Sequence, residues 1–288
     1  MGFPASGRRV VWRDMVATRF RVVPSLVRVS WKANRPMRSF TARVVVVLAL
    51  AACTREADRP VSGEILVAAA ADLALAMPEL TDAFHEQTGL NVIATLGSTG
   101  QLAQQIEAGA PIDVFLAADR IWVDRLQRAD RLEDGTRAVY AYGVLVYMSQ
   151  DETIVRSGLE GIRSSAVRRL AIANPEHAPY GRAAKQVLES VGMWADLDAK
   201  IVLAENARQT VQFVETKAVD AAIAPLSLMT DGRGYWTPIS DSLHEPIEQT
   251  LAIPRSSAHK AEARRFAAFI TSQEGQAILV RYRFVLPE

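Results

Sequence analysis

Short runs of strand-forming residues alternate with helical segments along most of this chain, and this alternation limits the folds that it can adopt. The strand-like runs are residues 65–69, 92–96, 113–117, 139–148, 169–173, 201–204, 220–224 and 251–253. Between them, apolar residues recur three and four positions apart, as in amphipathic helices. The alternation predicts an α/β fold with open, largely parallel sheets. Ligands of such sheets bind beyond the carboxyl ends of the strands.

The strand-like runs fall into two blocks, and the last run looks like a return to the first block. The long apolar run at 139–148 is a candidate crossing between the two. With 288 residues, of which 49% are hydrophobic, the chain can bury a core of this size. We predict two interdigitated lobes: lobe I from residues 63–143 plus 250–288, and lobe II from residues 144–249.

The segment before these lobes predicts export across a membrane. Residues 37–43 are basic, and residues 44–52 form an apolar run that ends at Cys53. A transmembrane helix needs about twenty apolar residues, so this run is too short to span a bilayer but suits the core of a signal peptide. The sequence Leu50-Ala51-Ala52-Cys53 resembles the lipobox of bacterial lipoproteins, in which the cysteine is lipidated and becomes the mature N-terminus.

We therefore predict a lipoprotein signal peptide over residues 37–52, lipidation of Cys53 and a linker over residues 53–62. The alternative is that Cys53 is an incidental thiol after an ordinary signal peptide, which would leave the protein free in the periplasm. A single cysteine cannot form an intrachain disulfide. Residues 1–36 fit no export signal, so we expect that they are a non-native upstream extension and that translation starts at Met37.

The distribution of charge excludes one class of partner. The first 52 residues carry ten Lys and Arg side chains against one Asp, although the net charge of the whole chain is +1. The remaining 23 basic and 31 acidic side chains give the rest of the chain a net charge of −8. Nucleic-acid binding depends on clustered positive charge, so we expect no nucleic-acid partner.

The sequence lacks the patterns of common catalytic and metal sites. The four histidines have no metal-ligand spacing, and one cysteine cannot complete a zinc site. No nucleophile elbow, P-loop or zinc-protease motif is present. We therefore expect a binding protein with no cofactor and no bound metal cation. The alternative from another class is an α/β enzyme that uses Tyr180, His177 and Glu205, although nothing in the sequence arranges these residues as a catalytic set.

Four strand-to-helix turns carry the candidate binding residues. They lie at Ala71-Asp72, Ser98-Thr99, Pro179-Tyr180 and Asn206-Ala207. The first N–H groups of a helix have no intrahelical partner and carry partial positive charge, so such turns can bind anions. Serine and threonine hydroxyls can add donors, although a hydroxyl before a helix more often serves only as a helix cap.

The turns, taken in order, resemble those of the molybdate-binding subunit of bacterial ABC importers. The matching segments are AAAADL (68–73), GSTGQLAQQIEAGAPIDVFLAAD (97–119), IANPEHAPYGRAA (172–184), AENARQT (204–210) and TSQEGQAILVRYRFVLP (271–287). The resemblance implies a two-lobed type II periplasmic-binding-protein fold, with a tetrahedral oxyanion held in the cleft by neutral donors. It also implies a monomeric receptor that captures molybdate, and tungstate too, and delivers it to an ABC permease and its ATPase at the periplasmic face of a membrane.

The resemblance also assigns residues to the ligand site. It places Ala71, Asp72, Ser98 and Thr99 at the ligand from lobe I, and Tyr180 and Ala207 from lobe II. The chain departs from the family pattern at two points. Pro225 stands where some members have tyrosine, and the first turn offers Ala71 and an acid where Ser or Asn is common.

Asp72 fits an anion site poorly, because a carboxylate repels a dianion. We expect its side chain to cap its own helix, so that only its amide meets the ligand. Alternatively, as an acceptor in the pocket, it would favour a protonated oxyanion such as hydrogen phosphate. Receptors for sulfate or phosphate therefore remain alternatives. Molybdate, tungstate and sulfate differ in size, and the sequence does not give the size of the cavity.

Overall fold

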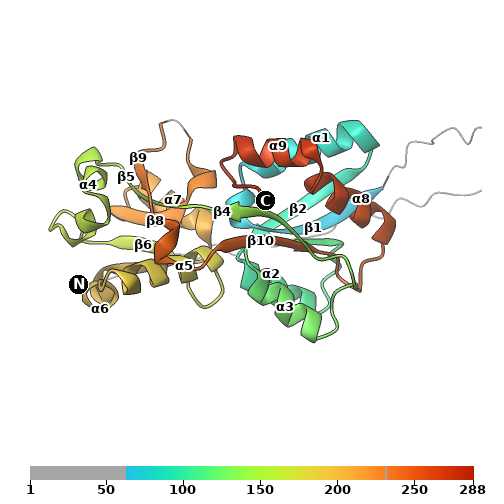
Figure 1. The fold of residues 1–288 in the computed structure, drawn as a ribbon, viewed down its shortest axis with the longest axis horizontal. Coiled ribbons are helices and arrows are strands. Elements are labelled where there is room, and N and C mark those ends of the chain that lie inside the picture. Colours follow the sequence, from blue (N-terminus) through green and yellow to red (C-terminus); the bar gives the residue numbers. More distant parts are fainter. Residues whose placement is uncertain (1–62, 231) are drawn as a thin grey trace, which may run out of the picture. The chain divides into compact units, whose positions relative to one another are not determined.

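Two five-stranded sheets organise residues 63–230 and 232–288, which are the residues that this computed structural model describes (Figure 1). They belong to one compact unit of the chain, residues 56–288. The predicted extension, signal peptide, Cys53 lipidation site and linker lie outside the described residues. In the part of the chain that is described, none of the helices has both the length and the apolar character needed to cross a membrane.

Lobe I is the first sheet with its helices, and its strand order is β2-β1-β3-β10-β4. Its strands are β1 (Glu64–Ala70), β2 (Asn91–Gly97), β3 (Val114–Ala117), β4 (Ala138–Gly143) and β10 (Ile247–Ala252). Its helices are η1 (Ala71–Leu73), α1 (Ala76–Thr88), α2 (Thr99–Glu107), α3 (Arg120–Arg128), α8 (Lys260–Ile270) and α9 (Gln273–Arg281). Helices α1, α8 and α9 cover one face of the sheet, and α2 and α3 cover the other (Figure 1).

Both faces of the lobe I sheet are buried, as the side chains of β1 show. Ile65, Val67 and Ala69 pack into the apolar cluster that contains Phe84 of α1. Ala68 packs into the cluster on the opposite face, beneath α2 and α3. Successive strand residues point to opposite faces, so a strand covered by helices on both sides has to be apolar throughout. This packing fixes the ends of the strands, where the candidate turns begin.

Lobe II is the second sheet with its helices, and its strand order is β7-β6-β8-β5-β9. Its strands are β5 (Leu145–Ser149), β6 (Leu170–Ala173), β7 (Ile201–Ala204), β8 (Ala221–Pro225) and β9 (Tyr235–Pro238). Its α-helices are α4 (Glu152–Arg156), α5 (Pro179–Ser190), α6 (Trp194–Leu197) and α7 (Ala207–Glu215). Its 3-10 helices are η2 (Gly158–Arg163), η3 (Asp198–Lys200), η4 (Leu226–Leu228) and η5 (Asp241–Leu243).

Each sheet is mixed, because one strand in each, β10 in lobe I and β5 in lobe II, runs against the others. In lobe I, β1 is parallel to β2 and β3, whereas β10 is antiparallel to β3 and β4. In lobe II, β6 is parallel to β7 and β8, whereas β5 is antiparallel to β8 and β9. The candidate turns at Ala71-Asp72, Ser98-Thr99, Pro179-Tyr180 and Asn206-Ala207 all follow strands of the parallel parts.

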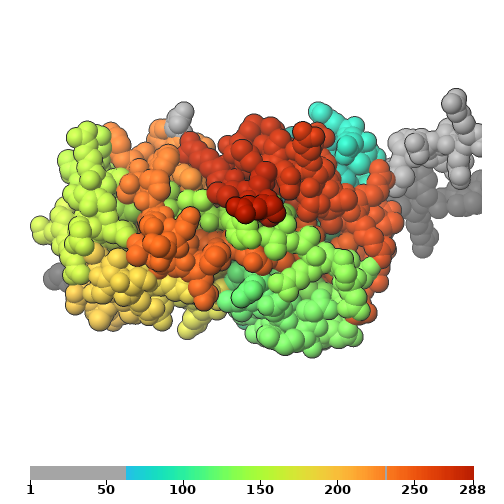
Figure 2. All heavy atoms as spheres, viewed as in Figure 1, coloured from blue at the N-terminus to red at the C-terminus, as the bar shows by residue number. Residues whose placement is uncertain are grey.

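The crossings between the lobes differ in detail from the sequence prediction. The run at 139–148 is two strands, β4 and β5, because its two halves pair in different sheets. The return strand β10 begins at Ile247, slightly before the predicted boundary at residue 250, because residues 247–249 already pair with β4. The end of the chain also lies on lobe I. Val285 and Tyr142 exchange backbone hydrogen bonds of 2.7 and 3.0 Å, and Figure 2 shows the dark red C-terminal residues beside the green β4 segment.

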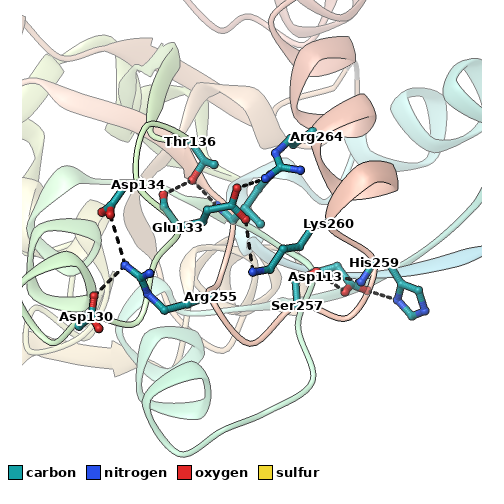
Figure 3. A network of polar contacts seen from close by, with 11 residues as sticks. Asp113, Asp130, Glu133, Asp134, Thr136, Arg255, Ser257, His259, Lys260 and Arg264 are labelled. Carbon is teal, nitrogen blue, oxygen red and sulfur yellow. Dashed lines mark hydrogen bonds and ion pairs between the residues drawn. The ribbon is translucent and has the colours of Figure 1, made fainter.

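A polar network joins the segment after β10 to the start of β3 (Figure 3). The Asp113 carboxylate accepts hydrogen bonds from the Leu66 N–H (2.9 Å) and the Ser257 hydroxyl (2.7 Å), and it lies 3.2 Å from Nδ1 of His259. Burial alone would raise the pKa of Asp113, but these hydrogen bonds and the His259 charge outweigh it and lower the pKa. The ionised carboxylate therefore holds three segments of lobe I together.

Candidate functional site

A small cavity lies between the two lobes, at the carboxyl ends of parallel strands. All six candidate residues line it: Ala71, Asp72, Ser98, Thr99, Tyr180 and Ala207. The lining is completed by Ala70, Gly97, Ala118, Ala178 and Pro179. The structure thus brings together four turns that are far apart in the sequence. The cavity volume is about 10 Å³, close to what one water molecule requires.

The Thr99 hydroxyl is available as a donor at the start of α2. Thr99 is 1% exposed, and its Oγ1 accepts a 3.1 Å hydrogen bond from the Ala118 N–H. A hydroxyl has one donor and two acceptor positions, so this bond leaves its proton free for a ligand. Thr99 is the first residue of the helix rather than its cap, and its side chain joins two turns of lobe I.

Ser98 occupies the N-cap position of α2, but its side chain makes no capping hydrogen bond. Instead, its hydroxyl donates a 2.6 Å hydrogen bond to the carbonyl of His177 in lobe II and lies 2.9 Å from Nδ1 of that histidine. The Gly100 N–H donates to the same carbonyl at 2.8 Å. A Cβ at Gly100 would lie 2.8 Å from the Cβ of His177, so this approach of the lobes requires glycine. His177 therefore shapes the turn and bridges the lobes.

Backbone amides complete the donor set. Helix α7 begins at Ala207, and its N-cap residue Asn206 accepts a 3.1 Å hydrogen bond from the Gln209 N–H. This cap pairs with the backbone N–H of Gln209 and leaves the backbone N–H of Ala207 without a capping partner. The first-turn N–H of Ala207 therefore remains a donor that an anion in the cavity can use.

The expectation that Asp72 caps its own helix is wrong. Asp72 lies inside the single turn of η1, whose N-cap is Ala70, and its side chain makes no capping hydrogen bond. The longer helix α1 begins only at Ala76. The side chain is instead 1% exposed, and its Oδ2 accepts a 2.8 Å hydrogen bond from Nε2 of Gln249. Its Oδ1 is buried with no hydrogen-bond partner among the described residues.

The Asp72 carboxyl belongs to a buried network that spans both lobes. Nε2 of Gln249 also lies 3.3 Å from the Tyr180 hydroxyl, and the Tyr140 hydroxyl donates to Oε1 of Gln249 at 3.1 Å. A Cβ at Gly143 would overlap the Tyr180 hydroxyl, so glycine at the end of β4 makes room for it. Tyr180 of lobe II is therefore held against the crossing from lobe I.

Burial raises the pKa of Asp72 from 3.8 to about 6, although hydrogen bonds from the Tyr180 hydroxyl, Gln249 and nearby backbone amides oppose the rise. Burial, and next the negative charge of Asp72, raise the pKa of Tyr140 and of Tyr180 well above 10. Both tyrosines are therefore protonated and can donate. The carboxyl of Asp72, in contrast, changes its charge close to neutral pH.

Four residues of this region escaped the sequence analysis: Tyr140, Gly143, Ser227 and Gln249. The Ser227 hydroxyl donates a 2.9 Å hydrogen bond to the carbonyl of Asp72, so η4 of lobe II lies against η1 of lobe I. Ser227 closely follows Pro225, the departure from the family pattern noted above. Gln249 stands between Glu248 and Thr250, just before the strand-like run at 251–253, so no local sequence signal singles it out.

A second polar bridge joins the lobes beside the cavity. Asp119 caps α3 by accepting a 3.2 Å hydrogen bond from the Trp122 N–H, and it forms an ion pair with Arg182 of α5. Burial raises the pKa of Asp119 and the charge of Arg182 lowers it, with a net rise. The pair borders a wider cavity of about 270 Å³. Among the described residues, no group of three or more His, Cys, Asp or Glu side chains could hold a metal ion.

Comparison with known proteins identifies the family. Residues 65–285 match the sequence model of a family described as "Bacterial extracellular solute-binding protein". The chain belongs to this family. It is 32% identical over 252 residues to the molybdate-binding protein ModA of Azotobacter vinelandii, which covers 85% of this chain and 97% of that protein. The solved structure of the A. vinelandii periplasmic molybdate-binding protein matches with a TM-score of 0.75 and 30% identity, over 78% of this chain and 100% of that one.

Another relative extends these comparisons. YvgL of Bacillus subtilis, whose name describes a candidate ABC transporter substrate-binding lipoprotein, is 26% identical over 85% of this chain and 96% of its own length. The predicted fold class, an α/β periplasmic-binding-protein fold, is confirmed. Membership of a family of extracellular solute-binding proteins also confirms the predictions that the chain acts outside the cytoplasm and is a binding protein rather than an enzyme.

Proposed function

We propose that this protein captures molybdate, and tungstate with it, and delivers the ion to the permease and ATPase of an ABC importer. The observation that carries this proposal is the composition of the cavity between the lobes. It is lined by hydroxyl groups and first-turn residues of four strand-to-helix turns, and within the described residues no Lys or Arg side chain lines it. The relatives named as molybdate-binding proteins support the choice of ligand.

Neutral donors suit a tetrahedral dianion. The hydroxyls of Thr99 and Tyr180 and the N–H of Ala207 would donate to the oxygens of molybdate, and the metal itself would have no protein ligand. Ser98, whose hydroxyl proton is donated to the His177 carbonyl, would lie beside these donors. Partial positive charge at the helix N-termini supplies the electrostatic attraction, so no fixed cation is required. Molybdate is then a transported ligand and not a resident cofactor, and a monomer supplies the whole site.

Closure of the two lobes couples binding to transport. Each lobe carries part of the donor set, so the ion stabilises the closed arrangement by contacts that the open one cannot make. The bridges from Ser98 to His177 and from Asp119 to Arg182 support the closed arrangement. The permease would then receive the closed, loaded protein.

Thermal unfolding with a panel of oxyanions tests this function. Molybdate or tungstate at about 100 times its Kd should add about 2.7 kcal/mol of stability, and the rise in Tm should be about 5 to 10 °C for a protein of this size. Sulfate and phosphate at equal concentration serve as controls. A rise with phosphate and none with molybdate would refute the assignment.

We further propose that Cys53 carries a lipid that holds the protein at the periplasmic face of a membrane. The lipobox-like sequence at Leu50-Ala51-Ala52-Cys53 and the description of YvgL as a lipoprotein support this. Labelling of cells with a fatty-acid analogue should mark the full chain and not its Cys53→Ser variant. Equal labelling of both chains would contradict the proposal.

A further inference from the structure

One buried oxygen of a residue that lines the cavity has no hydrogen-bond partner among the described residues. Asp72 is 1% exposed and is one of the residues that line the cavity. Its Oδ2 is engaged by Gln249, whereas Oδ1 is buried without a hydrogen-bond partner. Buried polar atoms in native proteins are usually paired, because an unpaired one costs free energy. Oδ1 is therefore the oxygen of this carboxyl group that can still take a partner.

The surroundings of Asp72 contain nothing that would neutralise its charge. The polar groups of the hydrogen-bond network around it are neutral: Tyr140 from β4, Tyr180 from α5, the side-chain amide of Gln249 from β10, and Ser227 from η4. No cation is among the groups that influence the pKa of its carboxyl. An ionised carboxylate next to a bound dianion would place like charges together in a dry site, which strongly disfavours the charged form.

We infer that Asp72 is protonated when the oxyanion is bound, so that its Oδ1–H donates a hydrogen bond to the ion and each binding event takes up one proton. The carboxylate receives this proton from solvent, and the ion stays a dianion with no bond in it formed or broken. The resulting neutral acid adds a donor to the site and removes the repulsion. The inference rests on the proposed function, because it places a dianion in this cavity.

The expected affinity follows from the titration of Asp72. Burial holds its pKa at about 6 in the ligand-free protein, and a dianion beside it raises the pKa further. Only the protein molecules in which Asp72 is protonated then bind the ion. The Kd for molybdate should rise by about 50-fold between pH 6 and pH 8, at close to tenfold per unit in the upper part of this range.

The experiment is isothermal titration of the anion-free protein with micromolar molybdate at pH 6, 7 and 8, in pairs of buffers with different ionisation enthalpies. For the unmodified protein we expect an uptake of about one proton at pH 8 and about half a proton at pH 6. The variant Asp72→Asn keeps the shape and offers a fixed N–H donor. Its Kd should change by less than about threefold over this range, and at pH 8 it should bind more tightly than the unmodified protein, which a merely structural role for Asp72 does not predict.

His177 is another titratable group near the donors, and it provides the matched control. Its Nδ1 lies 2.9 Å from the Ser98 hydroxyl. The variant His177→Gln should keep the pH slope of the Kd even where its affinity changes. If Asp72→Asn fails to fold, as judged by its thermal transition, Asp72→Ser takes its place, and proton uptake by the unmodified protein decides the question independently.

Each outcome of this experiment is decisive. A pH-independent Kd with no proton uptake, or an Asp72→Asn variant that keeps the slope, overturns the inference and leaves molybdate binding intact. A slope that disappears in His177→Gln assigns the proton to the histidine and also overturns it. If molybdate, tungstate and sulfate all fail to bind at pH 6, where much of Asp72 is protonated, the proposed function itself fails.

Discussion

The substitution Asp72→Asn should stabilise the ligand-free protein at neutral pH, because it removes a buried charge. Burial raises the pKa of Asp72 from 3.8 to about 6. At 1.36 kcal/mol per pKa unit, this shift of about two units corresponds to about 3 kcal/mol. Since the folded-state pKa lies above the unfolded-state value, the folded protein binds more protons in this interval. The contribution of the Asp72 carboxyl to stability is therefore most favourable at low pH and is lost as the pH rises from about 4 to about 6.

The measurement is urea unfolding of the anion-free protein and the variant, followed by far-UV circular dichroism at pH 4.5 and pH 7.5. The free-energy advantage of Asp72→Asn should grow by about 2 kcal/mol between these pH values. Any cost of fitting the amide into the Gln249 network is the same at both pH values and cancels in this difference. In thermal unfolding, the corresponding change in the Tm difference is about 4 to 8 °C for a domain of this size.

The exposed Asp198 provides the matched control. The variant Asp198→Asn removes one negative charge from an exposed position, so it controls for the change in net charge alone. If the advantage of Asp72→Asn were the same at pH 4.5 and pH 7.5, the buried carboxyl would not titrate in this interval. Burial would then not control the protonation of Asp72.

Three further substitutions test other parts of the structure. Thr99→Val should weaken molybdate binding by about 1–3 kcal/mol in isothermal titration, because it removes a buried donor and the partner of the Ala118 N–H. The control variant Thr99→Ser should bind nearly normally. Unchanged affinity in Thr99→Val would place the hydroxyl outside the ligand site. Gly143→Ala should lower stability by about 1–3 kcal/mol in urea unfolding and also weaken molybdate binding, since the Cβ of the alanine would overlap the Tyr180 hydroxyl. A variant with unchanged stability and unchanged affinity would contradict this close approach of Gly143 and Tyr180. Asp113→Asn should lose about 1–3 kcal/mol of stability at pH 7 in urea unfolding. Because the folded-state pKa of Asp113 is lowered, this loss should shrink as the pH falls below about 4. A loss of the same size at pH 3 would exclude the ionised carboxylate as its source.

The sequence predicts the location of the candidate turns because their signals are local. An apolar run followed by a helix-starting residue marks each strand-to-helix turn, and the strand order then brings the turns together. The same local signals fail at 139–148, where one apolar run is shared by two sheets. Nothing in the run itself shows that β4 and β5 pair with different partners.

The environment of Asp72 could not be predicted, because it is made by distant segments. Gln249 lies 177 residues after Asp72, and Tyr180 lies 69 residues before Gln249. In an alternating strand, a polar residue such as Gln249 is ordinarily assigned to the solvent-facing side. A helix-cap role for Asp72 was the expectation from local sequence, and burial between the lobes replaced it with a long-range hydrogen bond.

The backbone bonds between Val285 and Tyr142 determine where the molecule can bend. They fasten the C-terminal segment to β4, so this segment travels with lobe I as one rigid body. The bending between the lobes is then confined to the short links that follow β4 and precede β10. A fluorescent reporter near Val285, paired with one on lobe II at the exposed Asp198, would register opening and closing as a change in energy transfer without touching the cavity.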